Sequence, residues 1–475
     1  MSDLREAGAR KDTKRGSHTA TAEKIMPIYA RLPRGPHPLD APGVAHNQRI
    51  RIHGGMIEAV ATRGYPQTSV KLVVGLAGVS RRSFYEQFSS KEACFTATFD
   101  LILARALRRL TRTYRAAAGD PPERLRAAFR AWVAELEQNP KALRLVLVEA
   151  ETAGPEGMWR LQRAAAAFEE PLASALARRP PAGGAKRGGT PAEPLPPPVV
   201  RAIVGGLRRA TELRLLDDDT AELGALAGEM LKWTLLFDAP AAARLRARAC
   251  AHRPFPDSPA LECGACGGDS RRARLLRSAI EVGLREPKFE SLSSPLIADG
   301  AGLPFEAVTE LFADPVSCYM QALQALGDEL LQAVASRELV SERWPAAVCD
   351  AVERLLCHLA SSPARLLTLA VRAPAAGPEA IASLRELSYE LATMLTEGAP
   401  ARARSRIAVE AIAGGVWQII CCEALAGRGH MLPALAEHVS YVVLAPYIGP
   451  DAALAAIVRS REAAGRTTGA WPSAA

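Results

Sequence analysis

The stretch from residue 68 to residue 91, TSVKLVVGLAGVSRRSFYEQFSSK, constrains the fold of this 475-residue chain more than any other. Its apolar residues recur at helical spacing, namely Val70, Val73, Val74 and Leu76. Gly78 tolerates a positive φ and so permits a tight corner, and Ser80 can cap a second short helix. The pattern predicts two helices joined by a sharp turn, which is a helix-turn-helix.

The second short helix begins with side chains that suit a DNA duplex. The first residues of a recognition helix lie closest to the base edges of the major groove. Arginine can pair bidentately with guanine, while hydroxyl and ammonium groups can reach phosphate oxygens. The candidate DNA-binding residues are Lys71, Ser80, Arg81, Arg82, Ser83, Tyr85 and Lys91. The alternative is an amphipathic helical hairpin whose basic face is only solvated.

Several motifs occur in order between residues 51 and 95: R-I-x(5)-E-A, Gly64-Tyr65, Thr68-Ser69, A-G-V-S and F-Y-x-x-F-x-S-K-E. Together they resemble the TetR family of bacterial regulators. The resemblance implies an effector-gated regulator, in which Thr68 and Ser69 cap the second helix near a phosphate. Two departures from the family pattern, Gly54-Gly55 and Val74, predict a loosened first helix and altered packing.

Composition favours an all-α chain with more than one domain. The length of 475 residues exceeds what one core normally holds, and alanine, leucine and arginine dominate while β-branched runs are scarce. The net charge of +8 is compatible with a polyanionic partner. Nine cysteines and no leader-like N-terminus predict a reducing cytoplasm, and no apolar run predicts a membrane span. No catalytic motif is found, so we expect no enzyme.

The chain repeats itself in three aligned blocks. At a shift of 224, LAGVSRRSFYEQFSSKEACF falls on GAGLPFEAVTELFADPVSCY; at 223, Ala153-Gly154-Pro155-Glu156 meets Ala376-Gly377-Pro378-Glu379. At 209, the segment AIVGG at 202–206 meets AIAGG at 411–415. We interpret the chain as two TetR-like units in tandem, with chance similarity between alanine-rich helices as the alternative.

This interpretation divides the chain into seven segments. We expect a disordered basic arm (1–46), a helix-turn-helix head (47–95), a helical ligand and dimerisation region (96–238), a linker (239–270), a degenerate head (271–319), a second helical region (320–462) and a disordered tail (463–475).

The two heads differ in charge. Over residues 68–91, four Lys or Arg and one Glu give 4 − 1 = +3, whereas residues 292–315 carry four Asp or Glu and no Lys or Arg, giving −4. Binding to DNA depends on neutralising phosphates, so only the first head should read DNA. The resemblance implies pairing through the last two helices, where adjacent glycines suggest close helix approach. The units could pair within one chain as a pseudo-dimer, which we prefer, or between chains as a homodimer.

Two further groups of residues are candidates for sites. Large apolar residues in the first helical region could line an effector pocket, although plain core is the alternative: Trp132, Met158, Trp159, Phe168, Met230 and Trp233. Cys250, His252, Cys263 and Cys266 could clasp zinc, or they could be free thiols in a linker. We expect no other cofactor.

The favoured function is a cytoplasmic transcriptional regulator that binds double-stranded DNA through its first head. A repressor switched by a small apolar effector fits the resemblance best. The alternative is a protein-interaction adaptor, built from two regulator-like folds, that no longer binds operators.

Overall fold

The computed structural model describes residues 41–177, 194–216, 223–237, 239–247, 270–286, 289–335, 343–400 and 406–468. Within these ranges the chain forms helices and turns and no β-strand, so the expected all-α class is confirmed. The abundance of alanine and leucine, which are strong helix formers, accounts for this class.

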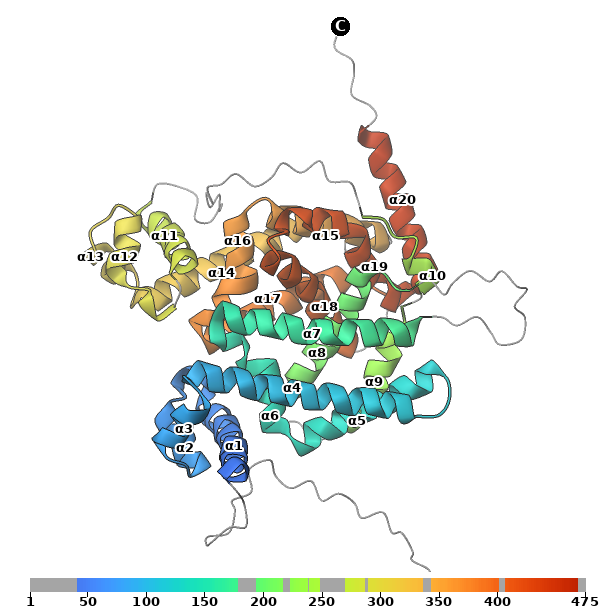
Figure 1. Ribbon diagram of the computed structural model, residues 1–475. Helices are drawn as coiled ribbons and strands as arrows, with labels where there is room; N and C mark the ends of the chain where they lie inside the picture. Colours follow the sequence, from blue (N-terminus) through green and yellow to red (C-terminus); the bar gives the residue numbers. More distant parts are fainter. Residues whose placement is uncertain are drawn as a thin grey trace, which may run out of the picture.

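The N-terminal half consists of a three-helix head and a helical body (Figure 1). The head contains α1 (Ala41–Gln67), α2 (Val70–Ala77) and α3 (Arg81–Gln87). The body contains α4 (Lys91–Ala116), α5 (Pro121–Gln138), α6 (Pro140–Arg144), the π-helix η1 (Leu145–Glu149), the 3-10 helix η2 (Glu151–Ala153), α7 (Gly154–Leu176), α8 (Pro197–Leu216), α9 (Leu223–Thr234) and α10 (Ala239–Ala242).

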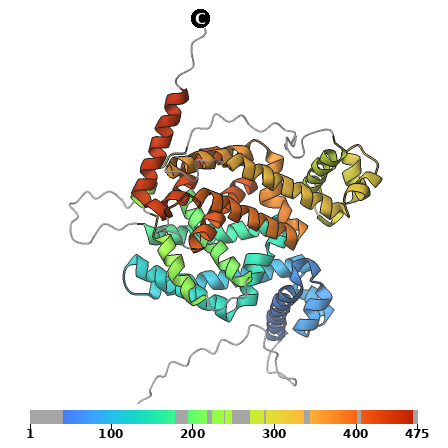
Figure 2. The same cartoon turned by 180° about the vertical axis from the view of Figure 1, so that it is seen from behind.

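The C-terminal half follows the same order. A second head contains α11 (Arg271–Arg285), the 3-10 helix η3 (Phe289–Ser291), α12 (Ser294–Gly300) and α13 (Glu306–Leu311). The second body contains α14 (Pro315–Val334), α15 (Trp344–Ala360), α16 (Pro363–Leu367), the π-helix η5 (Thr368–Arg372), η6 (Ala373–Ala376), α17 (Pro378–Thr396), α18 (Arg406–Leu425), η8 (Gly429–Leu435), α19 (Ala436–Ile448) and α20 (Pro450–Thr468). Both heads project from the same side of the joined bodies (Figures 1 and 2).

Three segment boundaries differ from those expected. Helix α1 begins at Ala41, inside the segment expected to be a disordered arm, and α20 continues to Thr468, inside the expected tail. The start of the expected linker forms the short helix α10, in which Ala239, Ala241 and Ala242 are buried. Alanine is a strong helix former, and composition alone did not show that these segments are helical.

Irregular features recur at matched positions in the two halves. The π-helices η1 and η5 begin 368 − 145 = 223 residues apart, and each is followed by a 3-10 helix and a glycine with positive φ. These glycines are Gly154, with φ of 75°, and Gly377, with φ of 113°. Gly78 and Gly302 at the two head corners both have φ of 61°. A π-helix is rare in proteins, so its recurrence relates the two halves more closely than shared regular helices would.

Helices α8 and α18 cross at their paired glycines. A Cβ added at Gly206 would lie 2.6 Å from the Ala411 oxygen, and one added at Gly415 would lie 2.6 Å from the Ala202 oxygen. Adding 209 to 206 gives 415, and subtracting 209 from 411 gives 202, so each contact is the equivalent of the other. The crossing therefore has approximate two-fold symmetry. The close approach expected from the glycines is therefore observed, and no larger residue fits without moving the facing backbone.

Two long apolar helical stretches of the described chain lie in the interior of the second half. By length and composition, Ile407–Leu425 and Gly429–Ile448 could each cross a membrane, yet 89% and 83% of their most apolar windows are buried within the protein. This degree of burial is typical of helices in a protein core.

Candidate DNA-binding head and ligand cavity

The corner of the first helix-turn-helix is held by a glycine and an arginine. Gly78 adopts the left-handed conformation, and its amide donates to the carbonyl of Gly75 at the end of α2. The Arg51 guanidinium, from α1, donates to the Gly78 carbonyl over 2.6 Å. This bond fixes the turn against the first helix, and the sequence analysis gave Arg51 no such role.

The polar face of α3 lies at the surface because its apolar face packs into the head. The Ser80 hydroxyl accepts from the Ser83 amide over 3.0 Å, which confirms the expected cap. Phe84 and Phe88 are buried, with 0% and 5% of their surface exposed. Tyr85 is 57% exposed and therefore points away from the head.

The structure places most of the predicted DNA-binding residues at the surface. The exposed ones are Ser69, Lys71, Ser80, Arg81, Arg82 and Tyr85. Ser69 caps α2 by accepting from the Leu72 amide, and Arg82 donates to Glu86 over 3.0 Å in an exposed pair. Ser83 is half-buried. These residues come from α3 and from the start of α2, as a groove-reading head requires.

Thr68 and Lys91 lie differently from the expectation. Thr68 is buried, and its hydroxyl donates to the Gly64 carbonyl over 2.8 Å, so it faces the head rather than a phosphate. Lys91 is half-buried; its ammonium lies 4.4 Å from the centre of the Tyr65 ring. Each residue holds the end of α1, a role that spacing alone could not separate from phosphate contact.

Gly55 lets the first helix pack closely on the second, which confirms the altered packing expected at this position. A Cβ added at Gly55 would lie 2.6 Å from the Val73 carbonyl oxygen and 3.0 Å from Ala77. The absence of a side chain therefore allows α1 and α2 to approach closely. The departure from the family pattern is a packing feature.

A buried histidine joins the head to the body. His53 Nδ1 donates to the Thr98 hydroxyl over 2.8 Å, because that hydroxyl donates in turn to the Cys94 carbonyl over 2.7 Å. Burial, and to a lesser degree the charge of Arg49, lowers the pKa of His53 to about 4. The imidazole is therefore neutral at pH 7 and links α1 to α4.

The second head has a similar corner, but its outward side chains differ from those of the first head. Arg274, like Arg51, donates to the corner, in this case to the carbonyls of Ala301 and Gly302. Phe305 stands where the first head has Arg81, and it is 52% exposed. Glu310 on α13 pairs with Arg271 of α11 over 2.9 Å. The reading surface of this head is thus apolar and acidic, which opposes contact with phosphates.

A cavity of about 410 Å³ lies in the body of the first half, between α4, α5, α7, α8 and α9. Three of the six predicted pocket residues line it, namely Trp132, Phe168 and Met230. The prediction was wrong for the others. Met158 and Trp233 are buried core residues away from the cavity, and Trp159 is 42% exposed beneath the Arg163 guanidinium.

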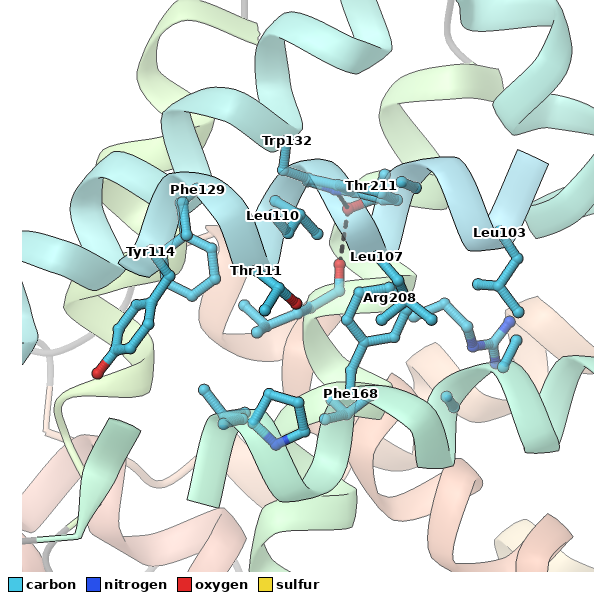
Figure 3. A pocket seen from close by; sticks show the side chains of 18 of the residues that line it. Leu103, Leu107, Leu110, Thr111, Tyr114, Phe129, Trp132, Phe168, Arg208 and Thr211 are labelled. Atoms are coloured by element: carbon cyan, nitrogen blue, oxygen red, sulfur yellow. Dashed lines mark hydrogen bonds between the residues drawn. The ribbon is translucent and has the colours of Figure 1, made fainter. Parts of the chain in front are cut away.

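One wall of this cavity was not predicted from the sequence: α4 forms it with Leu103, Leu107, Leu110 and Tyr114. The eleven residue steps from Leu103 to Tyr114 span roughly 16 Å of helix, so the wall is long. Figure 3 shows Leu103 and Arg208 toward one end of the cavity and Tyr114 and Phe129 toward the other. These apolar positions recur every three or four residues, which could have predicted an apolar face on this helix. The arginines between them made the helix resemble a solvated basic one.

Few polar groups face the cavity. The Trp132 indole donates to the Thr211 hydroxyl over 3.1 Å, so both are satisfied (Figure 3). Arg208 is buried and lies 3.2 Å from Glu151 and 3.6 Å from Glu212. Arg385 of the second half contacts the same two carboxylates. The cavity therefore ends at a buried charge cluster that both halves share.

The matching region of the second body is almost filled by side chains. The corresponding region has a cavity of about 10 Å³, lined by Leu355, Leu391, Trp417 and their neighbours. Trp417 stands 209 residues after Arg208, so a bulky indole replaces the arginine that ends the larger cavity. Of these two matching cavities, the one in the first body has a volume that suits a small molecule.

The four predicted zinc ligands, Cys250, His252, Cys263 and Cys266, lie outside the described residues. Among the described residues, no group of three or more His, Cys, Asp or Glu is arranged to hold a metal ion.

The geometry of α1–α3 defines a helix-turn-helix DNA-binding protein. Residues 57–98 match the family model described as "Bacterial regulatory proteins, tetR family". The N-terminal head is therefore that of a TetR family regulator. No curated protein matches the chain.

Solved structures of regulators are similar to part of the chain. The fatty acid degradation regulator FadR from Bacillus halodurans is 19% identical over 39% of this chain and 96% of its own, with a TM-score of 0.34. FadR from Bacillus subtilis, in complex with stearoyl-CoA, is 18% identical over 39% and 96%, with a TM-score of 0.33. A TetR-like regulator from Rhodococcus sp. RHA1 is 17% identical over 43% and 97%, with a TM-score of 0.33.

Proposed function

We propose that this protein is a cytoplasmic, ligand-responsive transcriptional repressor that reads DNA with its first head only. The observation that carries the proposal is the exposed face of α3, where Arg81, Arg82 and Tyr85 project from a buried aromatic base. The second head, with Phe305 and acidic residues on the matching face, serves no reading role. No catalytic role is proposed.

We further propose that the chain is two TetR-like units paired as a pseudo-dimer. The support is the recurrence of η1 in η5, the equal φ at the two head corners and the two-fold contacts of α8 with α18. Pairing within the chain leaves one cationic head per molecule.

Ligand response would act through α4. This helix lines the cavity with Leu103 to Tyr114, and its first turns pack on the head through His53 and Thr98. A ligand that displaces α4 would therefore move α3 relative to the DNA, because packed helices shift as rigid elements. The effector class that fits these walls is a small, elongated, largely apolar molecule.

The DNA-binding part of the proposal is tested by affinity for duplex DNA as a function of salt. We expect Arg81→Ala with Arg82→Ala to reduce affinity by roughly 100-fold or more and the salt slope by about 2, because two cations leave the interface. The matched control is Arg108→Ala with Arg112→Ala, which removes two exposed arginines from α4 outside the head. Equal losses in both variants would contradict the assignment of α3 as the reading helix.

The ligand part is tested with the apolar fluorescent dye anilinonaphthalene sulfonate as the probe. Leu107→Trp adds volume inside the cavity and should abolish most dye binding. Leu101→Trp is the control, since Leu101 is exposed on the same helix. Unchanged dye binding by Leu107→Trp would remove the cavity from the proposal.

The adaptor remains the competing proposal, favoured by the exposed Phe305 and Leu296 on the second head. It predicts no sequence-specific DNA binding by the intact protein.

A further inference from the structure

Two ion pairs join α8 to α18, one on each side of the glycine crossing. Arg201 Nη1 lies 3.2 Å from Glu423 Oε1, and Arg214 Nη1 lies 2.9 Å from Glu410 Oε2. The Arg214 and Glu410 side chains are only 7% and 3% exposed, and Glu423 is 7% exposed. Arg201 also contacts Glu169 over 3.3 Å. Reversing the charge of one member would place two like charges together in a largely buried site, so each pair depends on its opposite signs.

The two pairs are related by the shift that relates the two helices. Adding 209 to 201 gives 410, and adding 209 to 214 gives 423. Positions 201 and 410 are therefore equivalent on the two helices, and so are positions 214 and 423. Each ion pair joins a residue of the first kind on one helix to a residue of the second kind on the other. The approximate two-fold relation of the glycine contacts extends to the charged residues.

The signs of the charges differ between the helices in a consistent way. Helix α8 carries arginine at both positions, and α18 carries glutamate at both. If α8 paired with α8 of a second copy in this geometry, Arg201 would face Arg214. If α18 paired with α18, Glu410 would face Glu423. Both like pairings bury like charges, whereas α8 with α18 buries opposite ones.

We infer that Arg201, Arg214, Glu410 and Glu423 make this surface selective, so that α8 fits α18 and rejects α8 of a second copy. The inference rests on the proposed pairing of two units. Its consequence is that a second chain is not recruited through this face, and the molecule presents one cationic head where a homodimer would present two.

Three double variants of the full chain test the inference at constant composition and net charge. Arg214→Glu with Glu410→Arg inverts one pair: it keeps opposite charges in both α8–α18 pairs and also places opposite charges between like helices of two copies, so it separates the α8–α18 contact from the rejection of a second copy. Arg214→Glu with Glu423→Arg places like charges in both pairs, and opposite charges between like helices of two copies. Because Glu423 also pairs with Arg428, Arg201→Glu with Glu410→Arg provides the same like-charge arrangement without an arginine at position 423.

The readouts are the thermal unfolding midpoint and the molar mass by light scattering, each relative to the wild type. The inverted pair should keep the wild-type mass and a midpoint within about 2 °C. The unfolding midpoint of both like-charge variants should fall by about 5 °C or more and their molar mass should rise, or the variants should fail to fold. If all three variants behave alike, whether stable or unstable, the selectivity is refuted.

Failure of this inference is distinguishable from failure of the proposed function. The proposed function fails if the wild type does not bind DNA sequence-specifically, which is measured without these variants. The charge arrangement is tested by mass and stability alone.

Discussion

Single residues decide whether the first head can hold its reading helix. Arg51 and Gly78 fix the corner, and Phe84 and Phe88 anchor α3 from below. Arg274 and Gly302 fix the corner of the second head in the same way, whereas the outward residues differ between the two heads. The residues that hold the head together are therefore different from the outward residues proposed to contact DNA.

His53 makes the stability of the first head depend on pH. Its pKa is about 4 in the folded protein and 6.5 when exposed. Between these values the unfolded state takes up a proton that the folded state does not, so stability falls as pH drops from 6.5 to 4. The loss is up to about 3 kcal/mol.

His53→Asn retains a donor for Thr98 and cannot titrate. We expect denaturant unfolding of this variant to lose less stability than the wild type over that pH range, while both stay flat from pH 7 to 8. Parallel pH profiles for the two proteins would show that His53 is not the titrating group.

The sequence predicted the caps and the corner because these depend on neighbours in the chain. Ser80 and Gly78 were found in that way. Thr68 and Lys91 were assigned to DNA, yet their partners are Gly64 and Tyr65. A hydroxyl or ammonium at a helix end suits either partner, and only the fold decides between them.

At the scale of elements, the helices were predictable and the cavity was only half predictable. Large aromatic residues mark candidate walls, but Trp233 packs against the helix crossing near Gly206 instead. The α4 wall uses leucines beside arginines on one long helix. Which face of such a helix borders a void depends on how its neighbours pack, and a single helix carries no information on that.

The helix crossing gives a prediction at this scale. Gly415→Ala should destabilise the protein by about 1–3 kcal/mol, because the new Cβ would meet the backbone of Ala202. Gly228→Ala, on α9 with open space around it, should stabilise by up to about 1 kcal/mol. Equilibrium unfolding in denaturant measures both, and an unchanged or raised midpoint for Gly415→Ala would argue against the close crossing.

At the scale of the whole molecule, the asymmetry between the halves is the main feature. One half has the cationic reading surface and the cavity of about 410 Å³; the other has an acidic reading surface and a cavity of about 10 Å³. The charge difference between the heads was predictable by counting residues. The loss of the second cavity was not, since it depends on how Trp417 and its neighbours fill the body.

The most direct test of the account is selection of bound duplexes from a random pool by the wild type, Tyr85→Ala and, as control, Tyr389→Ala, whose tyrosine is exposed in the second body. The account predicts one short motif without two-fold symmetry, enriched by the wild type and the control and weakened in Tyr85→Ala. A palindromic motif would contradict a single reading head, and enrichment unaffected by Tyr85→Ala, or no motif at all, would contradict DNA reading by α3.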